Sequence, residues 1–251
     1  MPTTTFIFDY KIKILYYKTS RQLRICAKGA KLSKVIKALI PVRSGSVRVK
    51  NKNIRPFADS NLLEIKIKQM LSIKNLDGII VNSNDDEMLD IAKSLGVETV
   101  KRQEYYASNE VSPNDLYVNI AENFNADIMV FANVTNPLLN NQTIIDCIEL
   151  YKTLDNQDSV NTVNFVKEFL WLDGKAINYN PDKKPRSQDL PDIVSINHAV
   201  NVIEKNLMIE RRDIFDYKPH LKIIDKIESI DIDDELDFEF AEFMYKKLRS
   251  K

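Results

Sequence analysis

Short apolar runs alternate with segments of helical periodicity between residues 35 and 163, and this alternation restricts the possible folds more than any other feature of the chain. The apolar runs predict buried strands at 35–40, 78–81, 97–100, 127–132 and 159–163. Apolar residues at helical spacing predict helices at 62–73, 88–95, 113–121 and 143–154. Strands that alternate with helices in this way form βαβ units. We therefore expect an α/β fold with a mostly parallel, Rossmann-like sheet that is covered on both faces.

The N-terminal segment does not follow this pattern. Residues 1–34 mix apolar, aromatic and basic side chains, and the stretch 10–15 alternates like a strand. Three interpretations of this leader stay open: a hairpin packed on the edge of the domain, a flexible leader, or translated sequence upstream of the true start. Residues 35–251 are expected to form one domain.

The alternation also stops after residue 163. The segment Lys167 to Asn180 predicts a hairpin with Asp173 and Gly174 at its turn, and residues 181–191 form a polar loop that contains prolines. These features predict a small β-rich lobe at about 164–200. A strand at 230–232 and a helix at 233–248 are expected to close the chain.

The composition excludes several classes of protein. The 36 basic residues balance the 36 acidic ones, so no overall field attracts nucleic acid. No apolar run reaches the roughly 20 residues that a membrane-spanning helix needs. The N-terminus lacks the pattern of a signal peptide, so we expect a cytoplasmic protein. The two cysteines, Cys26 and Cys147, match no metal-binding or redox spacing.

A polar, basic loop follows the first regular strand and has the composition of a phosphate-binding site. Gly45 and Ser46 are small enough for the backbone to approach a ligand, and four cationic residues surround them: Arg43, Arg48, Lys50 and Lys52. In parallel sheets, ligands bind beyond the carboxyl ends of the strands, which is where this loop lies. Taken alone, the loop could equally be a solvated basic surface.

Four later stretches add to the signal of this loop. They read IIVNSNDDEMLDIA at 79–92, FANVTNPL at 131–138, PRSQDLP at 185–191 followed by Asn197, and SIDIDDELD at 229–237. In order and spacing, these stretches and the loop residues Arg43, Gly45, Ser46, Arg48, Lys52 and Asn53 resemble the CMP-sugar synthetases, which are cytidylyltransferases for sialic acid and related nonulosonic acids. Five ordered blocks are far more specific than any one of them.

This resemblance implies a nucleotidyltransferase fold and an enzyme that transfers CMP from CTP to a nine-carbon sugar acid, with release of pyrophosphate. It implies catalytic roles for Arg43, Arg48 and Lys52. It implies CTP binding by Arg43, Gly45, Ser46, Arg48, Lys52, Asn53, Asn82 and Asn133, and sugar binding by Thr135, Lys167, Arg186 and Gln188. It also implies a homodimer that uses the small lobe for dimerisation.

The resemblance further implies Mg²⁺ as a cofactor, with Asp231 and Asp233 as its ligands. Two carboxylates at i and i+2 of an extended segment point to one face, where a single hard cation can meet both. An alternative for Asp233 is that it caps the following helix, because Asp234 and Glu235 have the composition of a first helical turn.

Several residues depart from the family pattern. Val47 replaces a lysine, Asn84 replaces the turn aspartate, and Asn133 replaces a glutamine; Lys50 stands in the place of a proline, and His198 in that of a glycine. Val47 cannot neutralise phosphate, and together with Asn84 it leaves a catalytically inactive nucleotide-binding relative as one alternative. A Kdo-type cytidylyltransferase is another. A dinucleotide-dependent oxidoreductase is disfavoured, because the loop lacks the GxGxxG spacing.

Overall fold

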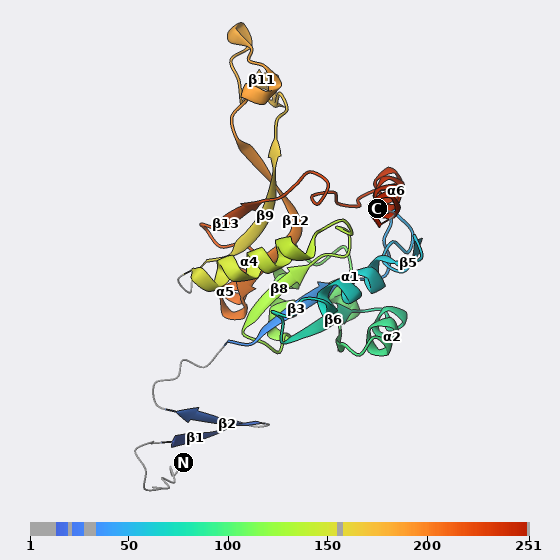
Figure 1. Ribbon diagram of the computed structural model, residues 1–251, viewed down its shortest axis with the longest axis vertical. Coiled ribbons are helices and arrows are strands. Elements are labelled where there is room, and N and C mark those ends of the chain that lie inside the picture. The colour runs from blue at the N-terminus through green and yellow to red at the C-terminus, as the bar shows by residue number, and fades with distance from the viewer. Residues whose placement is uncertain (1–13, 20–21, 28–33, 155–157, 250–251) are drawn as a thin grey trace. The chain divides into compact units, whose positions relative to one another are not determined.

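The computed structural model describes residues 14–19, 22–27, 34–154 and 158–249 of the chain (Figure 1). The chain divides into two compact units, Met1–Lys34 and Val35–Lys251. In the first unit, β1 (Ile14–Thr19) and β2 (Gln22–Ala27) pair antiparallel as a hairpin. The strand expected at 10–15 therefore begins at Ile14 within the described residues, and the rest of that expectation, at 10–13, lies outside them.

A seven-stranded sheet forms the centre of the second unit. Its order is β13 (His220–Ile223), β9 (Val160–Val166), β12 (Ile193–Glu204), β8 (Ile128–Ala132), β3 (Ile36–Pro41), β6 (Gly78–Ser83) and β7 (Glu98–Lys101). Strand β12 is antiparallel to both of its neighbours, and every other pair is parallel. The mostly parallel sheet predicted from the sequence is confirmed.

Helices cover both faces of this sheet, as Figure 1 shows. One face packs against α1 (Leu62–Leu71), α2 (Asp86–Ser94), α4 (Asn141–Thr153) and α6 (Glu235–Arg249), and the other against α3 (Pro113–Glu122) and α5 (Lys205–Arg211). The strands divide their side chains by alternation: Ala38 and Ile40 enter the first core, whereas Leu39 enters the second. Burial on both faces explains why these strands read as continuous apolar runs in the sequence.

The helices begin where the sequence supplies caps. The Ser112 hydroxyl accepts the Asp115 N–H, and Pro113 occupies the first turn of α3. The Asp85 carboxylate accepts the Met88 N–H and so caps α2. Two short strands, β4 (Pro56–Phe57) and β5 (Ser60–Asn61), form a tight hairpin that precedes α1. Among the described residues, no helix is long and apolar enough to cross a membrane.

Residues 167–192, here called the arm, extend from the paired ends of β9 and β12 (Figure 1). The predicted hairpin is present, with β10 (Trp171–Leu172) paired antiparallel to β11 (Lys175–Ala176). Asp173 and Gly174 have φ values of 49° and 74°, as expected of a two-residue hairpin turn. The rest of the arm contains two single 3₁₀ turns, at Pro181–Lys183 and Ser187–Asp189.

The structure differs from the sequence expectation in the C-terminal part of the chain. The periodicity predicts no element between 193 and 229, where the structure has β12, α5 and β13. The strand expected at 230–232 is wrong: this segment has no regular secondary structure and pairs with no strand of the described residues. Its one backbone hydrogen bond to a neighbouring element runs from the Ile232 N–H to the Thr135 carbonyl, at 2.9 Å. The final helix starts at Glu235, two residues later than expected.

Candidate active site

An open cavity of about 640 Å³ lies beyond the carboxyl ends of β3 and β8. The chain leaves β3 toward β6 on one side and later returns to β8 on the other, so the cavity is at the switch point where an α/β sheet binds its ligands. Its lining comprises residues Pro41, Val42, Arg43, Ser46, Val47, Arg48, Val49, Lys52, Asn53, Arg102, Asn109, Leu116, Tyr117, Ile120, Phe131, Asn133, Val134, Thr135, His198, Ile214, Asp231 and Asp233.

The basic loop after β3 is held in place at Arg43. One end of the guanidinium donates to the Ala107 carbonyl at 2.6 Å, and the other to Asn109 Oδ1 at 3.0 Å. The buried Asn53 amide donates to the Arg43 carbonyl at 3.0 Å, which ties the two ends of the loop together. Gly45 has a φ of 78°, a backbone conformation that residues with a Cβ atom rarely adopt. Arg43 is thus presented to the cavity without a carboxylate partner among the described residues.

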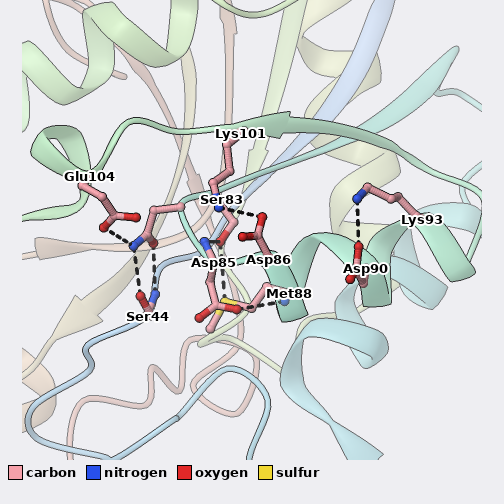
Figure 2. A network of polar contacts seen from close by, with 10 residues as sticks. Ser44, Ser83, Asp85, Asp86, Met88, Asp90, Lys93, Lys101 and Glu104 are labelled. Atoms are coloured by element: carbon pink, nitrogen blue, oxygen red, sulfur yellow. Dashed lines mark hydrogen bonds and ion pairs between the residues drawn. The ribbon is translucent and has the colours of Figure 1, made fainter.

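Asn84, which replaces the aspartate of the family pattern, bridges this loop to the segment after β7 (Figure 2). Its Oδ1 accepts the Ser44 N–H at 3.2 Å. Its Nδ2 donates to Ser44 Oγ at 3.0 Å and to the Glu104 carboxylate at 2.9 Å. An aspartate could not donate to Glu104, so the amide at position 84 matches its acidic neighbour. The departure therefore has a structural explanation in the shape of the loop.

The loop and the acidic segment near the C-terminus meet directly across the cavity. Arg48 forms an ion pair of 2.7 Å with Asp233, and Lys52 Nζ donates to the Ile232 carbonyl at 2.6 Å. Burial lowers the pKa of Lys52, while the carboxylates of Asp231 and Asp233 act in the opposite direction. Residues 180 positions apart in the sequence therefore form the two walls of one site.

The two aspartates differ in environment. Burial raises the pKa of Asp231, a hydrogen bond from the Thr135 side chain opposes this effect, and the nearby charge of Asp233 adds to it. One oxygen of Asp231, Oδ1, is buried and has no hydrogen-bond partner among the described residues. The side chain of Asp233 is 55% exposed. A buried oxygen without a donor beside a second carboxylate is the kind of site that a cation completes.

The capping alternative for Asp233 does not match the contacts at the start of α6. Asp234 Oδ1 accepts the Asp237 N–H at 3.0 Å, and Asp237 Oδ2 accepts the N–H groups of Asp233 and Asp234 at 3.0 and 3.1 Å. This reciprocal pair is a capping box. The helix start is thus satisfied by Asp234 and Asp237, and the Asp233 carboxylate is available to the cavity.

The donor set fits a Mg²⁺ ion that shares its coordination with a substrate. Within the described part of the chain, no group of three or more His, Cys, Asp or Glu side chains could hold a metal by itself. Mg²⁺ is commonly bound through one or two carboxylates, with substrate phosphates and waters as its other ligands. Asp231 and Asp233 would hold the ion on this chain.

Arg102, which the sequence patterns do not single out, is a further cationic group of the cavity. Its side chain is buried and donates to Asn82 Oδ1 at 2.6 Å and to the Asn82 carbonyl at 2.9 Å. Burial, and then the positive charge of Arg43, lowers the pKa of Arg102 to about 10. Asn82 does not line the cavity; it holds Arg102 there. The only signal in the sequence is that Arg102 follows β7, a strand of the parallel sheet.

The other predicted site residues fall into two groups. Ser46, Asn133 and Thr135 line the cavity; Val47 also lines it and is 83% exposed, whereas Lys50 is not among the lining residues. The sugar-binding candidates Lys167, Arg186 and Gln188 lie at the arm, outside the cavity lining. There, Lys167 pairs with Asp192 at 2.5 Å and Arg186 with Asp189 at 2.7 Å.

Comparisons with known proteins agree with this geometry. The sequence profile of the cytidylyltransferase family matches residues 37–248. The post-translational flagellin modification protein B of Campylobacter coli is 25% identical over 223 residues, which are 83% of this chain and 94% of that protein. An N-acylneuraminate cytidylyltransferase of Escherichia coli O18:K1:H7 is 28% identical over 223 residues, which are 85% of this chain and 53% of that protein.

Among solved structures, a CMP:2-keto-3-deoxy-manno-octonic acid synthetase in complex with CTP has a TM-score of 0.65. It is 10% identical in sequence, and the superposition covers 85% of this chain and 99% of that one. This similarity supports the fold, and the profile match extends over nearly all of the second unit. The chain belongs to the cytidylyltransferase family.

Proposed function

We propose that this enzyme transfers CMP from CTP to a nonulosonic, sialic-acid-like sugar acid and releases pyrophosphate. The observation that carries the proposal is the meeting of the basic loop with Asp231 and Asp233 across one cavity. Arg43 and Arg102 reach the same cavity without a carboxylate partner among the described residues, so the site has an excess of positive charge that suits a triphosphate. The similarity to an N-acylneuraminate cytidylyltransferase supports the choice of acceptor.

The reaction follows from this charge distribution. A hydroxyl oxygen of the sugar attacks the α-phosphorus of CTP in line and loses its proton to water. A new P–O bond forms, and the bond to the oxygen that bridges to the β-phosphate breaks as pyrophosphate leaves. Arg43, Lys52 and Arg102 bind the phosphates and neutralise the charge that develops on the leaving group. Arg48, which pairs with Asp233, lines the same cavity and adds its positive charge to the side of the triphosphate. Asp231 and Asp233 would hold a Mg²⁺ ion, which would supply further neutralisation of the phosphate charge.

We also propose a homodimer formed through the arm. Three large apolar side chains of the arm are more than half exposed, namely Trp171 at 55%, Leu172 at 61% and Ile177 at 57%. An exposed apolar group of this kind is typical of an interface. A second copy could bring Lys167, Arg186 and Gln188 to the cavity of its partner, which would give them the sugar-binding role expected from the sequence. We place the reaction in the cytoplasm, because the proposed donor CTP is a cytoplasmic nucleotide.

Release of pyrophosphate from CTP tests the proposal. The purified protein is incubated with CTP, Mg²⁺ and, in turn, N-acetylneuraminic, N,N'-diacetyllegionaminic, pseudaminic and Kdo acids. We expect turnover with at least one of the nine-carbon acids and none without an acid. Turnover with Kdo alone would favour the Kdo-type alternative. CTP binding without turnover of any acid would favour the inactive relative, the alternative that rests on Val47 and Asn84.

A further inference from the structure

His198 lies in an irregular part of β12 that faces the cavity. Ile196 pairs with Val163, and the next paired residue, Asn201, lies opposite Asn161. Four residues of β12, 197–200, therefore lie opposite the single residue Thr162 of β9. This irregularity is a large β-bulge. Bulges of this kind redirect a side chain and are frequent next to active sites.

Three hydrogen bonds fix the bulge in one conformation. The Thr162 hydroxyl donates to Asn197 Oδ1 at 2.7 Å and accepts the Val200 N–H at 3.1 Å. The same Asn197 oxygen accepts the Ala199 N–H at 3.2 Å. The residues held by these contacts, Asn197, Ala199 and Val200, flank His198 on both sides in the chain. These buried neighbours therefore fix the position of the His198 backbone. These contacts anchor the bulge, and the His198 side chain reaches the cavity from it.

The backbone of His198 has a φ of 54°, in the left-handed region that disfavours residues with a Cβ. The resembling family has glycine at this position, where the same backbone is free of that penalty. A non-glycine residue held in such a conformation at a cavity is a reason to look for a function of its side chain.

The imidazole itself is half-buried and lines the cavity. Its ring packs against Phe215, with 5.6 Å between ring centroids. Its own carbonyl accepts the Asn133 amide at 3.1 Å. No hydrogen bond from the described residues reaches either ring nitrogen. The ring thus shares the cavity with Asn133 and Asp231, and its polar atoms are available to a ligand.

The distribution of basic groups around the cavity suggests which ligand the ring meets. Arg43, Arg48, Lys52 and Arg102 belong to the loop and to the end of β7, the side proposed for the triphosphate. On the side of β8 and β12, His198 is the one basic residue among the described lining residues. An acceptor that attacks from this side carries a carboxylate, and a ring N–H is a suitable partner for it.

We propose that His198 is a specificity-determining residue for the acceptor, donating a ring N–H to the carboxylate of the sugar acid beside Asp231. This inference rests on the proposed function, because it requires that a sugar acid bind in this cavity. On this proposal, the interaction of the imidazole with the acceptor offsets the cost of the left-handed backbone at position 198.

Steady-state kinetics of H198G and H198N test the inference, with pyrophosphate release measured for the best of the four acids. H198G removes the ring and is compatible with the left-handed backbone. We expect its KM for the acid to rise about tenfold to hundredfold, the effect of losing one hydrogen bond to a charged group. The KM for CTP should equal that of the wild type, and the unfolding temperature should not fall below it. H198N, which also tolerates this backbone and keeps a donor, should recover part of the affinity. The matched control is H220A on the edge strand β13, which should change neither KM.

Three results would overturn the inference. An unchanged KM for the acid in H198G would show that the ring does not contact the acceptor. A parallel rise of both KM values together with a lower unfolding temperature would assign His198 a structural role. Absence of turnover by the wild type with all four acids would overturn the proposed function and this inference with it, whereas the first two results leave the proposed function intact.

Discussion

Replacing Lys66 with methionine should change how the stability of the protein depends on pH. Lys66 lies in α1 and is fully buried, and its Nζ donates to Gln69 Oε1 at 2.9 Å and to the Asn136 carbonyl at 3.0 Å. A neutral amine has two N–H donors, which these two acceptors satisfy, whereas an ammonium group would bury a third N–H without a partner. Burial lowers the pKa of Lys66 from 10.5 to about 7.

The sign of the effect follows from proton binding. Between about pH 7 and 10.5, the folded protein holds a neutral amine while the unfolded chain holds a proton there. Because the unfolded state binds more protons in this window, stability rises with pH across it. Below pH 7, both states are protonated and the full cost of the buried charge, on the order of 5 kcal/mol, opposes folding. Above pH 10.5, this cost is absent.

Urea unfolding followed by circular dichroism at pH 6 and pH 9 measures this dependence. Relative to K66M, the free energy of unfolding of the wild type should increase by about 2–3 kcal/mol between these two pH values. Other ionisable groups titrate alike in both proteins and cancel in the comparison. The control is K68M, because Lys68 has a side chain that is 56% exposed, and this variant should follow the wild type. Parallel curves for wild type and K66M would refute the reasoning.

Two further predictions concern Arg102, which lines the cavity, and Asn84, which contacts the basic loop. R102M should weaken CTP binding about tenfold or more, measured by calorimetry, because a buried cation that faces the phosphates is lost; its unfolding temperature should not fall, because the charge is buried without a carboxylate partner among the described residues. Affinity for CTP equal to that of the wild type would remove Arg102 from the site. N84D should lower stability by about 1–2 kcal/mol, because it places a second carboxylate against Glu104 and removes a donor. The double variant N84D/E104Q should recover most of that loss in thermal unfolding, and independent additive effects would argue against the bridge.

The parallel strands of the central sheet could be predicted because burial on both faces gives continuous apolar runs in the sequence. The helices could be predicted because burial on one face gives apolar residues at helical spacing. The antiparallel strand β12 could not, because its buried face carries asparagines that resemble a loop in sequence. In the structure, these polar groups are partly satisfied across strands: Asn161 Nδ2 donates to Asn201 Oδ1 at 2.8 Å, whereas Asn201 Nδ2 has no partner among the described residues. Only the tertiary pairing makes such residues compatible with a core.

The error at 230–232 has a related origin. Ile232 is buried while the residues beside it are not, so the alternation is real. Alternation reports burial on one side, however, and does not report pairing with another strand. The segment is packed against the core and held to the loop after β8 by one backbone hydrogen bond.

Site residues could be proposed from the sequence where a characteristic residue type stands at a recognisable spacing after a predicted strand. The cations of the basic loop and the two aspartates, Asp231 and Asp233, belong to segments with such spacing. Arg102 could not be predicted, because a single arginine after a strand forms no recognisable sequence motif. Only its buried contact with Asn82 in the structure distinguishes it. Lys167, Arg186 and Gln188 lie outside the cavity of one copy, and their predicted role depends on an assembly that one chain does not contain.

The most direct test of the account is the turnover of D231N with CTP, Mg²⁺ and the accepted sugar acid. The substitution keeps the shape of the side chain but removes the charge that would hold the ion. We expect the rate to fall by about two to three orders of magnitude, as when one group that stabilises transition-state charge is lost. Because burial raises the pKa of Asp231, its charge opposes folding at neutral pH, and D231N should unfold at the same or a higher temperature. A folded D231N enzyme with nearly the rate of the wild type would contradict the central claim that Asp231 and the basic loop form one cytidylyl-transfer site.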